Sequence, residues 1–191
     1  MKKGIILVIV GCFLIILSGL MVTYNHYEDK NAMIESRKVY DIIHNEELSI
    51  YGESEDVFEN KEMKSVKVDG YDYIATINIP ALNLELPVMS DWDYKRMKIS
   101  PCRYYGSIFT NDLVIAAHNF DNVFGRIKYL NEGDLLILTD MNNDKYIYKV
   151  EVVEILEAND VKEMIESEFD LTLYTCTKGG LSRVTVRLNR V

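Results

Sequence analysis

Three polar side chains in this sequence have the types and the spacing needed for acyl transfer: Cys176, His118 and Arg183. Cys176 ends the alternating run LTLYTC, and His118 ends the apolar run DLVIAAH. Arg183 follows Cys176 across a turn that contains Gly179 and Gly180. This turn is short enough to pair the two flanking strands, which would make Cys176 and Arg183 neighbours. His118 would join them only if its strand lies beside that of Cys176.

Each of these side-chain types suits one step of the chemistry. A thiol with the ordinary pKa of about 8.5 is only slightly ionised at neutral pH, yet its thiolate is a strong nucleophile. A histidine can protonate a leaving amine. An arginine keeps its charge and can hold a carbonyl oxygen or stabilise an oxyanion. Together they suit transfer through a thioester.

Spacing alone leaves a plainer interpretation open. In that interpretation Cys176 is a buried core thiol, His118 is structural and Arg183 is a surface charge. Arg187 also competes with Arg183, because their even separation places both on one face of the last strand. The position nearer to the cysteine end of the strand favours Arg183.

The N-terminal segment predicts a membrane anchor. Residues 4–22 carry no charge and, at ~1.5 Å per residue, span about 28 Å, close to the thickness of a hydrocarbon core. A cleaved signal peptide has a shorter apolar core and a small-residue cleavage site. Lys2 and Lys3 place the N-terminus in the cytoplasm and residues 24–191 outside the cell. The alternative is cleavage and lipidation at Cys12, although the segment stays apolar for ten residues beyond it.

The remaining pattern predicts three parts: residues 1–23 as a cytoplasmic stub and transmembrane signal anchor, 24–70 as an extracellular helix and linker, and 71–191 as a β domain. The second part contains an amphipathic helix near 28–46 and a linker near 49–65. In the third part, seven or eight short strands alternate with brief helices, one of them with Asp91 as N-cap. Such spacing is typical of an all-β sandwich or closed barrel. The net charge of -9 argues against a nucleic-acid partner.

The cysteines form no metal-binding motif. The chain has three, and neither a CxxC pair nor a Cys/His cluster is present, which argues against structural zinc. If Cys12 lies in the membrane, only a Cys102–Cys176 disulfide could form. The simpler interpretation of Cys102 is a buried structural thiol.

Several of these stretches resemble the sortases. LTLYTCTKGGLSRVTVRLNRV resembles the C-terminal signature of that family, in which a T-L-x-T-C strand precedes a loop and a strand that opens on arginine. LVIAAHNF resembles the histidine strand of the family, and YIATINIPALNLELPVM resembles its first two barrel strands. The resemblance covers residues 71–191. It implies a closed sortase-type β-barrel of about eight strands with short helices, preceded by the transmembrane helix.

The resemblance also implies roles for individual residues. Cys176 matches the nucleophile that forms the thioacyl intermediate, His118 the general acid/base, and Arg183 the arginine that contacts the substrate or oxyanion. Thr175 precedes the nucleophile, and Ala117 stands where many sortases have glycine, so both are candidate substrate-binding residues. The implied reaction is cleavage of an LPXTG-like sorting signal between Thr and Gly, followed by transfer to an amine of a cell-wall precursor or pilin.

Other properties follow only loosely from the resemblance. No cofactor and no metal are implied, although calcium stimulates some sortases through acidic residues, and Glu151, Glu154 and Glu157 are clustered in this chain. The class is left between class B-like and class D-like. Two other functions stay open: a membrane-anchored cysteine hydrolase that uses water as the acceptor, and a non-enzymatic extracellular β-barrel that binds a partner.

Overall fold

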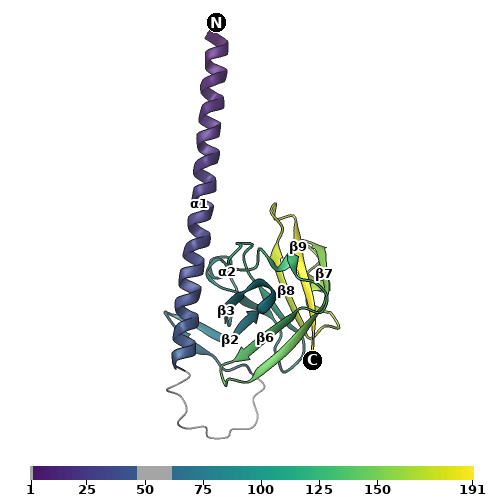
Figure 1. The fold of residues 1–191 in the computed structure, drawn as a ribbon. Coiled ribbons are helices and arrows are strands. Elements are labelled where there is room, and N and C mark those ends of the chain that lie inside the picture. The colour runs from purple at the N-terminus through teal and green to yellow at the C-terminus, as the bar shows by residue number, and fades with distance from the viewer. Residues whose placement is uncertain (1, 47–61) are drawn as a thin grey trace.

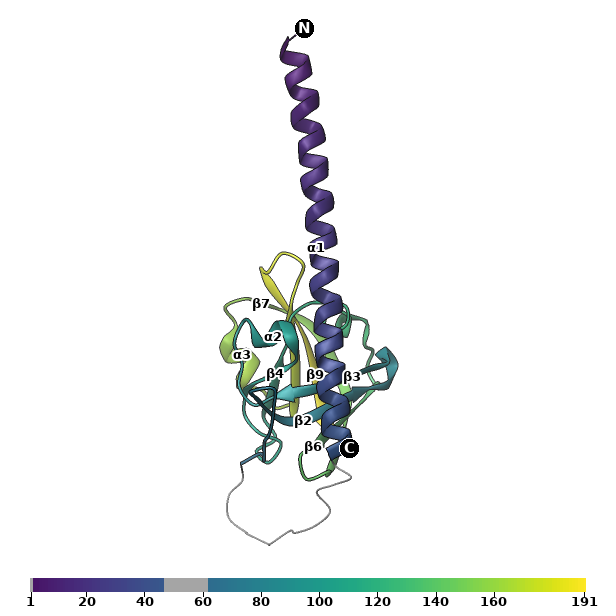
Figure 2. The ribbon, with the colours of Figure 1, turned by 90° about the vertical axis from the view of Figure 1, so that its left-hand side faces the viewer.

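A long N-terminal helix stands beside a β-barrel in this computed structural model, which describes residues 2–46 and 62–191 (Figures 1 and 2). The helix, α1, spans Lys2–Glu46 without interruption. The apolar segment and the outer helix, which the sequence predicts separately, therefore form one continuous element. The described residues contain one helix that is long enough and apolar enough to cross a membrane, and this helix is α1.

Burial divides α1 into two halves. The large side chains from Ile5 to Val22 are exposed, and no part of the stretch that could span a membrane is buried against the other described residues. Beyond Glu28, the side chains of Ala32, Ser36 and Val39 are buried at a spacing of three to four residues, which is one face of a helix. The outer half of α1 is thus docked on the barrel, whereas the first half presents the unbroken apolar surface that a bilayer requires.

The barrel is built from one mainly antiparallel sheet. Its strands are β1 (Val66–Val68), β2 (Tyr71–Ile79), β3 (Leu84–Met89), β4 (Cys102–Tyr105), β5 (Leu113–Ala116), β6 (Leu135–Asp140), β7 (Lys145–Glu157), β8 (Leu171–Cys176) and β9 (Ser182–Arg190). The order is β1-β2-β3-β4-β5-β8-β9-β7-β6, and an additional β2–β6 pairing closes strands β2 to β9 into an eight-stranded barrel. Closure leaves β1 as an extra strand, which pairs with β2 and with no other strand of residues 62–191.

Alternating side chains explain why these segments form a barrel, whose buried apolar side chains gather in two clusters. In β2, Ala75, Ile77 and Ile79 are fully buried, while Thr76 and Asn78 between them are partly exposed. The long strand β7 carries a register shift between Val150 and Val152, and such a bulge bends a strand.

Four short helical segments connect the strands. They are η1 (Pro80–Leu82), α2 (Arg96–Ile99), η2 (Ile127–Tyr129) and α3 (Val161–Ile165). The β8–β9 turn lies at the end of the barrel that faces the N-terminal half of α1, and the C-terminus lies at the opposite end (Figure 1). Cys176 immediately precedes this turn, so it lies at that same end.

The predicted closed barrel with short helices and an N-terminal apolar helix is confirmed. Two strands escaped prediction, β1 and β4, because their three and four residues are too few to show alternation. The equally short strand β5 was predicted because it is a continuous apolar run. The predicted cap of the helix after residue 91 was wrong. Asp93 Oδ1, rather than Asp91, accepts the backbone N–H groups of Lys95 (2.7 Å) and Arg96 (2.9 Å). Most of the predicted linker 49–65 lies outside the described residues.

Candidate active site

The strand order brings the three predicted chemical residues to one end of the barrel. Strands β5, β8 and β9 are consecutive in the sheet, and Cys176 ends the middle one. Arg183 on β9 is directly opposite Cys176. His118 follows β5, which runs parallel to β8 with Ala116 paired to Tyr174. Continuing that register by two residues places His118 beside Cys176, so Cys176 lies between the other two.

Hydrogen bonds hold the chain on both sides of His118 against β8. Ala117 N–H donates to Tyr174 O (3.2 Å), and Thr175 Oγ1 donates to Ala117 O (2.8 Å). Beyond the histidine, Asn119 Nδ2 donates to Thr177 O (3.5 Å). Thr175 and Ala117 are 2% and 1% exposed, so their side chains are buried in the barrel wall. Their predicted role in binding substrate stays a prediction.

The His118 ring is half-buried and packs on Phe120, with ring centroids 4.1 Å apart. Its backbone N–H donates to Met97 O (3.0 Å), which ties it to α2. Nδ1 is buried and has no hydrogen-bond partner among the described residues. Burial lowers the pKa of the imidazole below its ordinary value, and Lys98 lowers it further, while Glu28 and Asp29 act in the opposite direction. The imidazole is therefore mostly neutral near pH 7.

Cys176 and Arg183 share a pocket of about 170 Å³. Cys176 is thus a half-buried free cysteine that lines a cavity. The other lining residues come from the β3–β4 and β7–β8 connections and from β4, β7 and β8: Trp92, Tyr94, Met97, Tyr104, Glu157, Ala158, Asp160, Val161, Met164 and Tyr174. His118 is not part of this lining, which agrees with its place on the opposite side of Cys176.

An aromatic wall, defined here as Trp92, Tyr94, Tyr104 and Tyr174, forms much of that pocket. Trp92 lies 5.1 Å from Tyr104 and 5.7 Å from Tyr94, and Tyr104 lies 5.4 Å from Tyr174, measured between ring centroids. The sequence interpretation missed this wall. Tyr174 could have been found, because it lies two residues before Cys176 and therefore on the same face of the strand.

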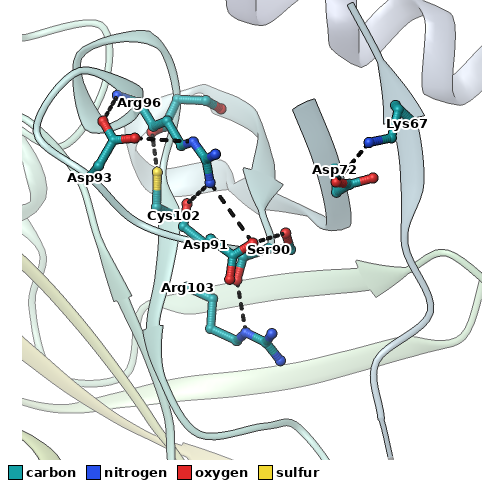
Figure 3. A network of polar contacts seen from close by, with 9 residues as sticks. Lys67, Asp72, Ser90, Asp91, Asp93, Arg96, Cys102 and Arg103 are labelled. Atoms are coloured by element: carbon teal, nitrogen blue, oxygen red, sulfur yellow. Dashed lines mark hydrogen bonds and ion pairs between the residues drawn. The ribbon is translucent and has the colours of Figure 1, made fainter. Parts of the chain in front are cut away.

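A polar network fixes the segment that carries Trp92 (Figure 3). Arg96 forms an ion pair with Asp93 (3.1 Å), and its Nη1 also donates to Asp91 O (3.4 Å). Arg103 Nε donates to Ser90 O (2.9 Å). These bonds close the segment into a loop and present its aromatic side chains to the pocket.

Cys102 lies in the same region and has a structural environment. It is 0% exposed, and its Sγ donates to Ser100 O at 3.4 Å (Figure 3). Burial raises the pKa of the Cys102 thiol to about 12, so it stays protonated at neutral pH. All three cysteines lie in the described part of the chain, and none forms a disulfide there.

The two competing arginines have different environments. Arg187 is 3% exposed, and its guanidinium binds Glu154 Oε1 (2.8 Å), Thr172 Oγ1 (3.1 Å) and the carbonyl oxygens of Glu163 (2.8 Å) and Met164 (3.3 Å). Arg183 is partly exposed and lines the pocket, with Nη1 donating to the carbonyl oxygens of Gly180 (3.0 Å) and Ser182 (3.1 Å). The geometry thus favours Arg183 for contact with a substrate.

The glutamates considered for calcium are partly engaged elsewhere. Glu154 pairs with Arg187 (2.8 Å), and Glu151 pairs with Lys149 (3.1 Å). Across residues 2–46 and 62–191, no group of three His, Cys, Asp or Glu side chains is arranged to hold a metal ion.

Replacing Arg187 with methionine is expected to lower the free energy of unfolding by about 3 kcal/mol, because it leaves the buried partners of the guanidinium without donors. Arg183→Gln is the matched control. It should change the free energy of unfolding by less than about 0.5 kcal/mol, since the Arg183 side chain is partly exposed. Denaturation followed by the fluorescence of Trp92, the single tryptophan, measures both. Equal losses in the two variants would contradict this distinction between the arginines.

Comparison with known proteins identifies the family and the fold. The sequence matches the sortase domain family over residues 77–191. Among solved structures, sortase A from Corynebacterium diphtheriae has a TM-score of 0.56 at 23% identity, over 63% of this chain and 61% of that one. Sortase C1 from Streptococcus agalactiae has a TM-score of 0.54 at 26% identity, over 61% of this chain and 66% of that one.

A sortase D5 transpeptidase from Clostridium perfringens matches over a longer stretch, with a TM-score of 0.59 at 17% identity over 85% of this chain and 99% of that one. This chain spans about three fifths of the length of the Corynebacterium protein. No curated protein is significantly similar to it in sequence. Because the family match covers more than half of the residues, the chain belongs to the sortase family.

Proposed function

We propose that this protein is a membrane-anchored cysteine transpeptidase. It cleaves an LPXTG-like sorting signal of surface proteins between Thr and Gly, and it transfers the new acyl group to an amine of a cell-wall precursor or pilin. The observation that carries the proposal is the strand register that sets Cys176 between His118 and Arg183, together with a pocket lined by Cys176 and Arg183.

The reaction has two acyl transfers. The Cys176 thiolate attacks the Thr carbonyl carbon, and the C–N bond to Gly breaks while the His118 imidazolium donates a proton to the departing amine. An acceptor amine then attacks the thioester, its proton passes to His118, and the thiolate leaves. Arg183 donates hydrogen bonds to the carbonyl oxygen as negative charge develops on it. Because the imidazole is mostly neutral near pH 7, only a minor fraction of the molecules carries the required imidazolium.

The composition of the pocket is evidence for a peptide substrate. The rings of the aromatic wall and the side chains of Met97, Val161 and Met164 provide apolar surface, and the polar residues of the lining are Cys176, Arg183, Glu157 and Asp160. A pocket that is mostly apolar, with a few convergent polar groups, is the usual form of a ligand site. The pocket is therefore suited to the apolar part of a sorting signal.

The proposed location is the cell membrane. Residues 4–22 of α1 would span the bilayer with the N-terminus in the cytoplasm, and the barrel would lie outside. What supports this is the exposed apolar half of α1, together with Lys2 and Lys3 at its start.

The test uses the full chain in lipid nanodiscs and a library of fluorogenic peptides varied around LPXTG. Mass spectrometry identifies the products with and without triglycine or a lysine amide as the acceptor. We expect cleavage after Thr, and a new amide bond between the Thr carboxyl group and the added amine. If every active peptide gives only the free acid, water is the acceptor and the protein is a hydrolase. If no peptide is cleaved, the enzyme proposal is wrong.

A further inference from the structure

The first docked turn of α1 lies next to the connections that hold His118. Glu28 and Asp29 are the first partly buried residues after the exposed apolar half of the helix. Along the axis, Glu28 is only about 9 Å beyond Val22, at a rise of ~1.5 Å per residue. The helix therefore contacts the barrel domain directly after the segment that could lie in the membrane. Two carboxylates, those of Glu28 and Asp29, make these contacts.

Each carboxylate contacts one of the two segments that hold the histidine. Lys98 Nζ lies 3.3 Å from Glu28 Oε1 and 3.4 Å from Oε2, and Lys98 directly follows Met97, whose carbonyl oxygen accepts the His118 N–H. Asp29 Oδ1 accepts the N–H of Asn122 (3.2 Å) in the loop that follows His118. These contacts join residues 70 and 93 positions apart in the sequence.

No side chain in the described part of the chain binds His118 Nδ1 directly, although that atom is buried. A catalytic base is usually oriented by a third group. Here the ring is held by its packing on Phe120 and by its backbone, so its position depends on the segments on either side.

We propose that Glu28 and Asp29 are positioning residues that hold the His118 segment through Lys98 and Asn122 and so couple the membrane anchor to the acid/base. The part of this inference that concerns catalysis rests on the proposed function. The part that concerns His118 itself does not require turnover.

The electrostatics around the imidazole agree with this arrangement. Glu28 and Asp29 on α1 favour the imidazolium, whereas Lys98 on α2 disfavours it. Cys176 on β8 and Arg183 on β9 are the titratable or charged groups at the adjacent strand ends. If the carboxylates are neutralised, the imidazolium should become rarer, and if Lys98 is neutralised it should become more common.

The test is a titration of His118 by NMR in the full chain in nanodiscs. The signal is assigned by its loss in His118→Ala, since the chain has only three histidines. We expect the His118 pKa to fall by about 0.5 in Glu28→Gln/Asp29→Asn, which is about a threefold loss of imidazolium near neutral pH. The His118 pKa should rise in Lys98→Gln. Lys38→Gln is the matched control, because it breaks the exposed ion pair between Lys38 and Asp69 (2.8 Å) farther along α1. This control should leave the His118 pKa unchanged.

A second comparison separates charge from position. Asn at position 29 keeps an oxygen that can accept the Asn122 N–H, whereas Asp29→Ala loses it. We expect Asp29→Ala to lower kcat severalfold with little change in KM, and Asp29→Asn to restore part of it. An unchanged His118 pKa in the double variant, or equal shifts in Lys38→Gln, would overturn the proposal. If the His118 pKa shifts as expected in these variants but the parent chain cleaves no peptide, the proposed function is contradicted and the positioning role is retained.

Discussion

Cleavage of the sorting peptide is expected to fall at least about a thousandfold when Cys176 is replaced with alanine, because the proposed route has no other nucleophile. The side chain ends β8 and is only half-buried, so its loss should leave the barrel stable. The measurement is the initial rate of cleavage by the full chain, together with mass spectrometry of the thioacyl intermediate. In the parent chain, that intermediate should appear on the peptide that contains Cys176.

Cys102→Ala is the matched control for this prediction. Its thiol is fully buried and protonated, so this change should retain most of the activity and instead lower stability modestly. A thiol reagent should modify Cys176 but not Cys102 in the folded protein. Substantial activity in Cys176→Ala, or resistance of the Cys176 thiol to modification, would favour a non-enzymatic barrel with a core cysteine.

His118→Ala is expected to lower kcat/KM by about 10²- to 10⁴-fold, the usual contribution of a positioned acid/base. In the parent chain, one limb of the kcat/KM profile should report a histidine with a pKa below its ordinary 6.5, because burial and Lys98 both disfavour the charged form. That limb should be absent in the variant. His26→Ala is the control, because this exposed residue of α1 lies outside the site.

A pH profile that is unchanged in His118→Ala would contradict the assigned role. Because Phe120 packs on the His118 ring, the substitution could also unfold the site. A loss of activity that accompanies unfolding would therefore not support the acid/base role. The near-native fluorescence of Trp92 in the variant therefore has to accompany the kinetic loss.

Local pattern determined most of the barrel strands and singled out Cys176, His118 and Arg183 as candidates, and the resemblance to the sortases implied their catalytic roles. The alternation in YDYIATINI and LTLYTC has the period of two that is typical of a strand, and both segments are strands in the structure, although β8 is buried on both faces. The short turn after Cys176 contains Gly180 with φ +73, a conformation that suits glycine, so the pairing of Cys176 with Arg183 was also predictable. The strands β1 and β4 were not predicted, because their three and four residues are too few to show a period and neither is a continuous apolar run like β5.

The tertiary structure decided what surrounds these residues. That β5 lies parallel to β8 follows from strand order, which no local pattern encodes, and only this pairing brings His118 to Cys176 across 58 residues. The sequence already favoured Arg183 over Arg187 because it lies nearer to Cys176, and the structure added that Arg187, on the same face of β9, is buried. The contacts of Glu28 and Asp29 with the histidine segments depend on how α1 docks. Periodicity predicts that a helix forms, but the surface that it covers is set by packing between elements distant in sequence.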